Sequence, residues 1–371
     1  MTFGLLKHFK GYKRGVHGNV TTAHFQHVIL GHDLGSILKL MELKRDCPDE
    51  TVRLVSSRAL TRQALLENYQ YGPTLIRSQA AVEGIYKRFF NAKIMPHPKG
   101  AIFYKEGKFH EFGSRAKSME LQAGEEFFTS PGYKLELSSL FSEEEWENLD
   151  NILQEHQEIR IFESIDKTTP TDLVNKSEWL LSFKDFSQVT CENLYVGISP
   201  KKFLSLFSNK DSLTPELIDL CASVDIQTGI SVTWMLNKDI FTEERTLFIP
   251  QSMTHEWGHF IVEFEPYEYH TKTQLCHVLF LIHEDEPQTE DLGSKIKLMK
   301  RVLDRVFPDI EQHITKEFIR FDDEMFISDI KERALEQVGF DYPNLKFLGQ
   351  VSPVSGNFSN EKFLSRTLLS H

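Results

Sequence analysis

The segment that most constrains the fold runs from His27 to Lys44, with the sequence HVILGHDLGSILKLMELK. It opens with the continuous apolar run Val28–Leu30, which is typical of a parallel strand that is covered on both faces. A turn that contains Gly31 and Gly35 leads into a helix pattern with a broad apolar stripe. A second strand pattern follows at Thr51–Val55. The segment therefore predicts one βαβ unit of a parallel sheet.

The rest of the chain predicts a mixture of helices and antiparallel strands. Its expected elements are a hairpin at 101–112, an acidic helix at 142–156 that opens with the capping signal Ser142 to Glu145, two strands within 178–197, strand-rich segments at 226–250 and 259–283, a helix from Lys295 to Thr315 that is interrupted near Pro308, and a strand at Leu345–Leu348.

Composition narrows the class of protein. The chain has 54 acidic and 42 basic residues, a net charge of −12, which argues against non-specific nucleic-acid binding. Its four cysteines are far apart and form no C-x-x-C pair, so we expect reduced thiols in a cytosolic protein. No apolar run approaches the roughly 20 residues of a membrane helix. We expect a cytoplasmic protein without a transmembrane segment.

Two further segments of the sequence are similar to motifs of a known family. Residues 192–200, ENLYVGISP, look like the family pattern A-d-x-V-V-x-A-x-P, and LKFLGQ at 345–350 looks like its C-terminal strand and G-D turn. With the βαβ unit at the front, this order resembles the FAD-dependent amine oxidase superfamily, which includes protoporphyrinogen oxidases and phytoene desaturases. The resemblance implies an FAD cofactor and flavin-dependent oxidoreductase chemistry.

The resemblance also implies a domain organisation. A Rossmann-like FAD/NAD(P)-binding domain of the α/β class would comprise residues 25–95, about 178–225 and 340–371. A mixed, antiparallel-rich domain of the substrate-binding type would be inserted as residues 96–177 and 226–339, both approximate. Residues 1–24 are polar and basic, and we expect a solvated N-terminal arm.

The turn after the first strand departs from the family fingerprint G-x-G-x-x-G. Gly31 takes the first position, Asp33 the second and Ser36 the third, and the resemblance implies that Gly31, Gly35 and Ser36 contact the pyrophosphate. Asp33 adds a negative charge there, and two like charges 4 Å apart cost about 4 kcal/mol at an effective dielectric of 20. Asp is also a good N-cap, so the carboxylate itself is expected to occupy the anion position of the helix.

Two other determinants differ as well. The second strand ends at Ser56, Ser57 and Arg58, where the family has an acid for a ribose hydroxyl. The two serines can still lie near that ribose, while Arg58 favours a 2′-phosphate, as in NADP sites. At the C-terminal turn, Gly349 and Gln350 are expected near the isoalloxazine, with Gln350 in place of the family's aspartate.

A competing motif occurs at residues 255–259, HEWGH, which matches the zinc-peptidase signature H-E-x-x-H. Its metal ligands would be His255 and His259, with Glu265 at the metzincin spacing. The motif needs a helix, whereas residues 260–265 alternate like a strand. On a strand the two histidines would lie about 13 Å apart, too far to share a metal. We therefore expect no metal.

Three hypotheses follow. The first is a divergent amine-oxidase-like flavoprotein with a degraded FAD site. The second is a flavin-free scaffold on the same fold that binds a protein or a small ligand, a situation that resembles the Rab GDP-dissociation inhibitors. The third is the zinc peptidase, which the strand context disfavours. The sequence assigns no catalytic residue and identifies no ligand.

Overall fold

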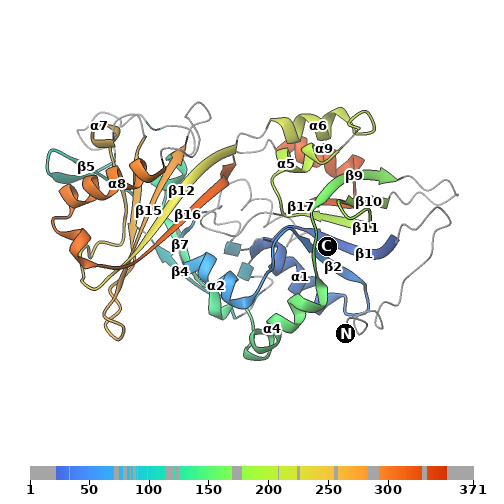
Figure 1. Ribbon diagram of the computed structural model, residues 1–371, viewed down its shortest axis with the longest axis horizontal. Coiled ribbons are helices and arrows are strands. Elements are labelled where there is room, and N and C mark those ends of the chain that lie inside the picture. Colours follow the sequence, from blue (N-terminus) through green and yellow to red (C-terminus); the bar gives the residue numbers. More distant parts are fainter. Residues whose placement is uncertain are drawn as a thin grey trace.

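The computed structural model describes residues 22–32, 34–70, 75–77, 82–83, 85–86, 89, 91–97, 99–112, 121, 125–168, 178–207, 209–223, 226–254, 258–282, 292–327 and 332–348. Two lobes are visible in Figure 1. One is built on a largely parallel sheet with helices on both sides, and the other on a mainly antiparallel sheet covered by α8. A small sheet that contains β4 and β7 lies between them.

The first sheet has the strand order β8-β2-β1-β11-β10-β9, and β17 also pairs with β11. The pairings of β1 with β2 and β11, of β2 with β8 and of β11 with β17 are parallel. Its strands are β1 (Thr22–Leu30), β2 (Val52–Ser56), β8 (Gln157–Ile159), β9 (Phe162–Thr168), β10 (Glu178–Phe183), β11 (Gln188–Val196) and β17 (Leu345–Phe347).

Helices cover both faces of this sheet, which explains why residues 28–30 are apolar without alternation. Ile29 packs on the side of α1 (Leu34–Asp46) and α4 (Glu143–His156), whereas Val28 and Leu30 pack on the opposite side. All three side chains are fully buried. The other helices of the lobe are α2 (Arg62–Gln70), α5 (Pro200–Ser205), α6 (Pro215–Ala222) and α9 (Glu332–Asp341).

The expected capping box of the acidic helix is confirmed. The backbone N–H of Glu145 donates to the hydroxyl of Ser142 at 3.1 Å, and the N–H of Ser142 donates to the Glu145 carboxylate at 2.8 Å. The turn after β11 is likewise built as its sequence predicts, because Ser199 caps α5 and Pro200 occupies its first turn.

The second sheet has the order β16-β12-β15-β14-β13-β5-β6, and the third has the order β3-β7-β4. Their strands are β5 (Ile102–Lys105), β6 (Lys108–Glu111), β12 (Ile226–Leu236), β13 (Thr246–Ile249), β14 (Phe260–Phe264), β15 (Gln274–Ile282), β16 (Ile314–Ile327), β3 (Leu75–Ile76), β4 (Lys93–His97) and β7 (Gly132–Glu136). The helices α7 (Gln251–Thr254) and α8 (Leu292–Val306) belong to the lobe of the second sheet. Short 3-10 turns occur at η1 (Glu125–Thr129), η2 (Leu137–Ser139) and η4 (Ile310–His313), and Leu137 of η2 packs in the core of the first lobe.

The hairpin predicted at 101–112 is confirmed as β5 and β6. Glu106 and Gly107 both have positive φ, at 54° and 79°, as a type I′ turn requires. The interruption predicted near Pro308 is confirmed, but the α-helix does not resume after it as far as Thr315, and a 3-10 turn and β16 follow instead. The helix α8 ends at Val306, and Pro308 and the left-handed Asp309 then turn the chain into β16, which pairs with β12.

Strand pairing differs from the expected grouping of segments in one place. Strands β8 and β9 lie within residues 96–177, which the sequence analysis assigned to the substrate-binding type of domain, yet they pair with β2 and β10 of the first sheet. They pair there because β8 continues directly from α4, which packs on that sheet. The limits of the two domains stay a prediction.

All four cysteines carry free thiols, as the sequence predicts, and Cys191, Cys221 and Cys276 are buried. Among the described helices, none is both long and apolar enough to cross a membrane.

Candidate functional site

The β1–α1 turn lies where three parallel strands end side by side. The backbone N–H of Gly31 donates to the carbonyl of Val55, at the end of β2, at 3.1 Å. On the other side, the N–H of Gly197 donates to the carbonyl of Leu30 at 2.6 Å. The carboxyl ends of parallel strands are where open α/β sheets bind ligands, so the turn has the position of a nucleotide site.

Close packing makes glycine necessary at the first position of the fingerprint. A Cβ on Gly31 would lie 2.5 Å from the hydroxyl of Ser36 and 3.0 Å from the Cα of Gly197, and the φ angle of Gly31 is 155°. Gly35 and Ser36 are buried in the first turn of α1. The structure thus brings three of the predicted residues together in one tight turn. Asp33, Gly349 and Gln350 lie outside the described residues, so their roles stay predictions.

The end of β2 presents its polar groups differently from the expectation. The hydroxyl of Ser56 donates to the carbonyl of Arg58 at 2.8 Å and accepts from its N–H at 3.1 Å, so it is engaged within its own turn and is buried. Ser57 and Arg58 are exposed. Arg62, the second cation near this turn, lies over the ring of Trp146, with its guanidinium carbon 5.1 Å from the ring centroid.

These residues fit one end of a dinucleotide. Glycine at position 31 permits the tight turn that leads the chain into the N-terminus of α1, where folds of this type bind a pyrophosphate. The end of β2 offers the Ser57 hydroxyl and the Arg58 cation, but no carboxylate for a ribose. The turn thus has the tight form that precedes a pyrophosphate site, and the described end of β2 provides only neutral or cationic partners.

The HEWGH segment leads into the strand β14, as predicted. His259 is buried, and its Nδ1 lies 2.7 Å from a carboxylate oxygen of Glu125. Glu265, at the other end of β14, pairs with His277 and Lys134 instead. His255 lies outside the described residues. Among the residues that the structure describes, no group of three or more His, Cys, Asp or Glu side chains is placed to hold a metal.

A buried row of polar side chains crosses the second sheet. Thr233 on β12 pairs with His277 on β15, which pairs with Glu263 on β14, which in turn pairs with Thr246 on β13. All four are at most 6% exposed. Thr233 and Nδ1 of His277 lie 3.0 Å apart, and the Thr246 hydroxyl donates to Glu263 at 2.9 Å. Buried polar groups are costly unless they are paired, so such a row in an apolar sheet indicates a site.

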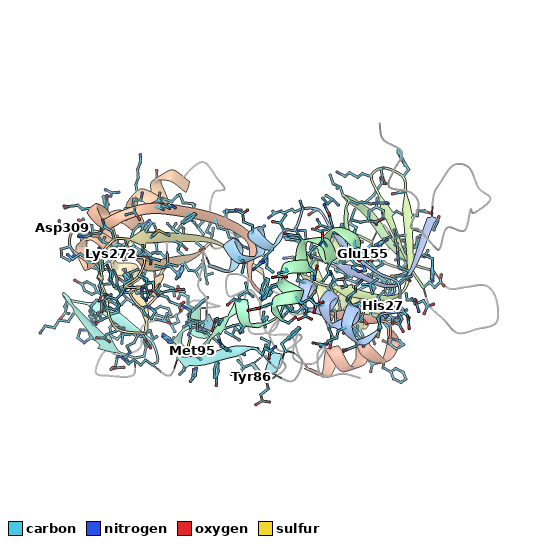
Figure 2. All side chains as sticks on the ribbon, turned by 90° about the horizontal axis from the view of Figure 1, so that it is seen from below. His27, Tyr86, Met95, Glu155, Lys272 and Asp309 are labelled. Atoms are coloured by element: carbon cyan, nitrogen blue, oxygen red, sulfur yellow. The ribbon has the colours of Figure 1, made fainter. Side chains whose placement is uncertain are left out.

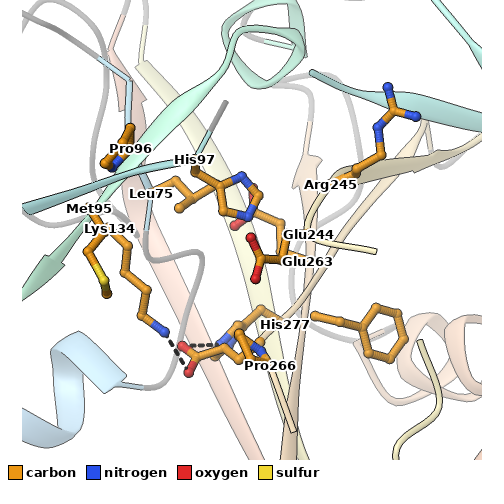
Figure 3. Close-up of a pocket in the computed structure, with 12 residues that line it drawn as sticks. Leu75, Met95, Pro96, His97, Lys134, Glu244, Arg245, Glu263, Pro266 and His277 are labelled. Carbon is orange, nitrogen blue, oxygen red and sulfur yellow. Dashed lines mark hydrogen bonds and ion pairs between the residues drawn. The ribbon is translucent and has the colours of Figure 1, made fainter. Parts of the chain in front are cut away.

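Two residues of the row, Glu263 and His277, line a cavity of about 240 Å³ between the second and third sheets (Figure 3). Its walls are Leu75, Met95, Pro96, His97, Lys134, Glu244, Arg245, Glu263, Phe264, Glu265, Pro266 and His277. The carboxylate of Glu265 is contacted from two sides, by Nζ of Lys134 at 2.8 Å and by Nε2 of His277 at 3.3 Å. The cavity therefore contains acids and bases in contact.

The carboxylates of Glu265 and Glu263 in this cavity have different partners. Burial alone would raise the pKa of Glu265, but the hydrogen bond and charge of His277, together with Lys134, lower it to about 2. Arg77, whose side chain is only 2% exposed, donates to Oε1 of Glu263. Oε2 of Glu263 has no hydrogen-bond partner among the residues that the structure describes. Burial also lowers the pKa of His97, so this imidazole is neutral near pH 7.

The sequence analysis did not identify this cavity. The available signal was a polar residue at an inward position of an otherwise apolar strand, at Thr233, Thr246, Glu263 and His277. Each of these residues is unremarkable alone, and only the register of β12 to β15 places them in one row.

No protein-family model and no curated protein sequence matches the chain. Solved structures do match it over nearly its whole length. Putrescine oxidase bound to putrescine superposes with a TM-score of 0.58 at 8% identity, covering 94% of this chain and 98% of that chain. The chain has the fold of the FAD-dependent amine oxidase superfamily.

Two further matches support this assignment of the fold. Cyclohexylamine oxidase from Brevibacterium oxydans has a TM-score of 0.58 at 8% identity, with 93% of this chain and 97% of that chain covered. A candidate protoporphyrinogen oxidase from Exiguobacterium has a TM-score of 0.51 at 10% identity, with 94% and 99% covered. The resemblance and the α/β fold class inferred from the sequence are confirmed.

Proposed function

We propose that this chain is a divergent oxidoreductase of the flavin amine-oxidase fold, in which the pyrophosphate end of the dinucleotide site is retained and the ribose end is degraded. The observation that carries the proposal is the turn at Gly31. Its backbone is packed against Ser36 and Gly197 so closely that no side chain fits, which supports the tight turn that the first glycine of the dinucleotide fingerprint makes before a pyrophosphate site.

The residues of the chain would divide the binding as follows. The N-terminal N–H groups of α1 attract the anionic pyrophosphate, and Gly31 makes the tight turn that leads into them. Ser57 and Arg58, which are exposed at the end of β2, bind the adenosine side without a carboxylate. A bound flavin would itself supply the hydride chemistry, while the protein orients it. Gly349 and Gln350 stay predicted neighbours of the isoalloxazine.

A second function is favoured by one observation. The buried hydroxyl of Ser56, which stands where the family has its acid, is engaged by Arg58 within the turn and is turned away from a ligand. A fold that has lost this contact can persist as a flavin-free scaffold that binds a protein or a small ligand. We also propose a cytoplasmic location, which the unpaired thiols support.

Flavin binding decides between the two functions. The purified protein should absorb at about 450 nm or gain this band in a titration with FAD. Gly31→Ala should weaken FAD binding at least tenfold, because its methyl group would lie 2.5 Å from Ser36. Gly293→Ala on α8 is the matched control, since a Cβ there meets no atom within 4 Å. A colourless protein that takes up no FAD would leave the scaffold as the function.

A further inference from the structure

The helix α8 presents a row of basic side chains to solvent. Its apolar side packs on the second sheet. The opposite side is exposed and carries Lys297, Arg301 and Arg305, which follow one another at intervals of four residues. Residues four apart lie one above the other on a helix, about 6 Å apart along its axis. The three cations therefore form one continuous row, which we call the basic stripe.

The basic stripe has no structural role that explains it. Within the part of the chain that the structure describes, none of its three cations takes part in an ion pair, whereas Lys300 at the side of the helix pairs with Glu317 at 2.6 Å. Like charges four residues apart destabilise a helix. Only Arg305 lies in the last turn, where a cation interacts favourably with the helix dipole. An exposed row of unpaired cations in this position indicates a binding surface.

The helix α4 of the first lobe has the opposite charge. It contains six acids and no lysine or arginine, whereas α8 contains five lysines or arginines and one acid. Three of the acids at the start of α4 are exposed and have no ion-pair partner among the described residues: Glu143, Glu144 and Glu147. We call these three residues the acidic face. The two helices also have nearly the same length, 14 and 15 residues.

The two helices lie in different lobes and do not meet within one chain. In Figure 1, α8 covers the second sheet and α4 lies beside the first. Figure 2 shows Glu155 of α4 and Asp309, three residues beyond the end of α8, in opposite lobes. A contact between the basic stripe and the acidic face therefore joins two copies of the chain. Because it uses a different surface on each copy, such a contact adds copies head to tail.

We propose that the basic stripe of one copy binds the acidic face of a second copy. Charge complementarity carries this choice of partner, since both surfaces are exposed, unpaired and presented along helices of matching length. A single exposed ion pair contributes little, so the contact depends on several pairs that form together and is weak. At about 0.1 M salt, the Debye length of about 10 Å screens the net charge of −12 on each copy, while adjacent ion pairs still attract.

The proposal is independent of flavin binding and is tested on the full chain by sedimentation equilibrium. At about 0.1 M salt, the weight-average mass should exceed that of one chain and rise with protein concentration. At about 1 M salt, where the Debye length is about 3 Å, it should return to the mass of one chain. The mass of one chain at every protein concentration up to about 0.5 mM, or association that is unchanged at about 1 M salt, would overturn the proposal.

Charge reversal locates the contact. One variant reverses the basic stripe, with Lys297→Glu, Arg301→Glu and Arg305→Glu, and a second reverses the acidic face, with Glu143→Lys and Glu147→Lys. Each variant alone should sediment as one chain, because its α4 and α8 surfaces then have the same sign of charge. A mixture of the two variants should associate again, since the reversed stripe is acidic and the reversed face is basic. Loss of folding cannot produce this recovery.

A matched control reverses three exposed lysines at and before the β5–β6 hairpin, with Lys99→Glu, Lys105→Glu and Lys108→Glu. It changes the net charge by the same amount as reversal of the basic stripe and should associate as the wild type does. Unchanged association after reversal of the stripe, equal loss of association in the control, or no association in the mixture of reversed variants would overturn the proposal.

Discussion

Replacing Glu265 by Gln should destabilise the protein in a pH-dependent manner. In the folded state, His277 and Lys134 hold the pKa of Glu265 at about 2, against an ordinary value of 4.5. The ionised carboxylate is therefore favoured by folding, and its contribution is present above pH 4.5 and lost as the pH falls towards 2. A shift of 2.5 units at about 1.4 kcal/mol each gives about 3 kcal/mol at pH 7.

The assay is urea unfolding of the wild type and Glu265→Gln at pH 7 and pH 3. The difference in the free energy of unfolding should be about 3 kcal/mol at pH 7 and should fall to about 1.4 kcal/mol at pH 3, where the wild-type carboxylate is only partly favoured by folding. Glu268→Gln, on the exposed hairpin beyond β14, is a matched control with little expected effect. A difference that is the same at both pH values would refute the ion-pair argument.

Two further predictions concern helix starts. Ser142→Ala should lower the free energy of unfolding by about 1 kcal/mol, because it removes the hydroxyl that accepts from the N–H of Glu145; an unchanged midpoint in thermal unfolding would contradict this. Asp33→Gly, predicted from the sequence alone, should lower stability by about 1 kcal/mol yet tighten FAD binding, since it removes both a cap and a negative charge. Weaker FAD binding by this variant would show that the carboxylate belongs to the binding site.

Much of the fold can be predicted from the sequence, because many of its elements are determined by local patterns rather than by distant contacts. The apolar run at Val28–Leu30 predicts a doubly covered strand, and the sequence Ser142 to Glu145 predicts a capped helix, because both depend on few distant contacts. The prediction that the helix extends to Thr315 is wrong because a distant contact decides the structure there. Residues 314–327 are held as a strand by their long pairing with β12, and the helical periodicity of the sequence does not include that contact.

The candidate sites differ in the same way. Gly31 could be predicted because its turn lies within one βαβ unit, and its packing against Ser36 is local. The hydrogen bond from the Ser56 hydroxyl to the carbonyl of Arg58 was not predicted, because a sequence does not show which group a serine hydroxyl will bond. The pairing of Arg77 with Glu263 joins residues 186 positions apart, and no periodicity in the sequence carries information about such a contact.

The central claim is that the turn at Gly31 still holds the pyrophosphate end of a dinucleotide. Displacement of isotopically labelled FAD from the protein by unlabelled ADP and by unlabelled FMN tests it most directly. ADP carries a pyrophosphate and the adenosine, whereas FMN carries the flavin with a single phosphate. The account predicts that ADP displaces FAD and that FMN competes far more weakly. Absence of FAD binding, or equal competition by FMN, would contradict the claim.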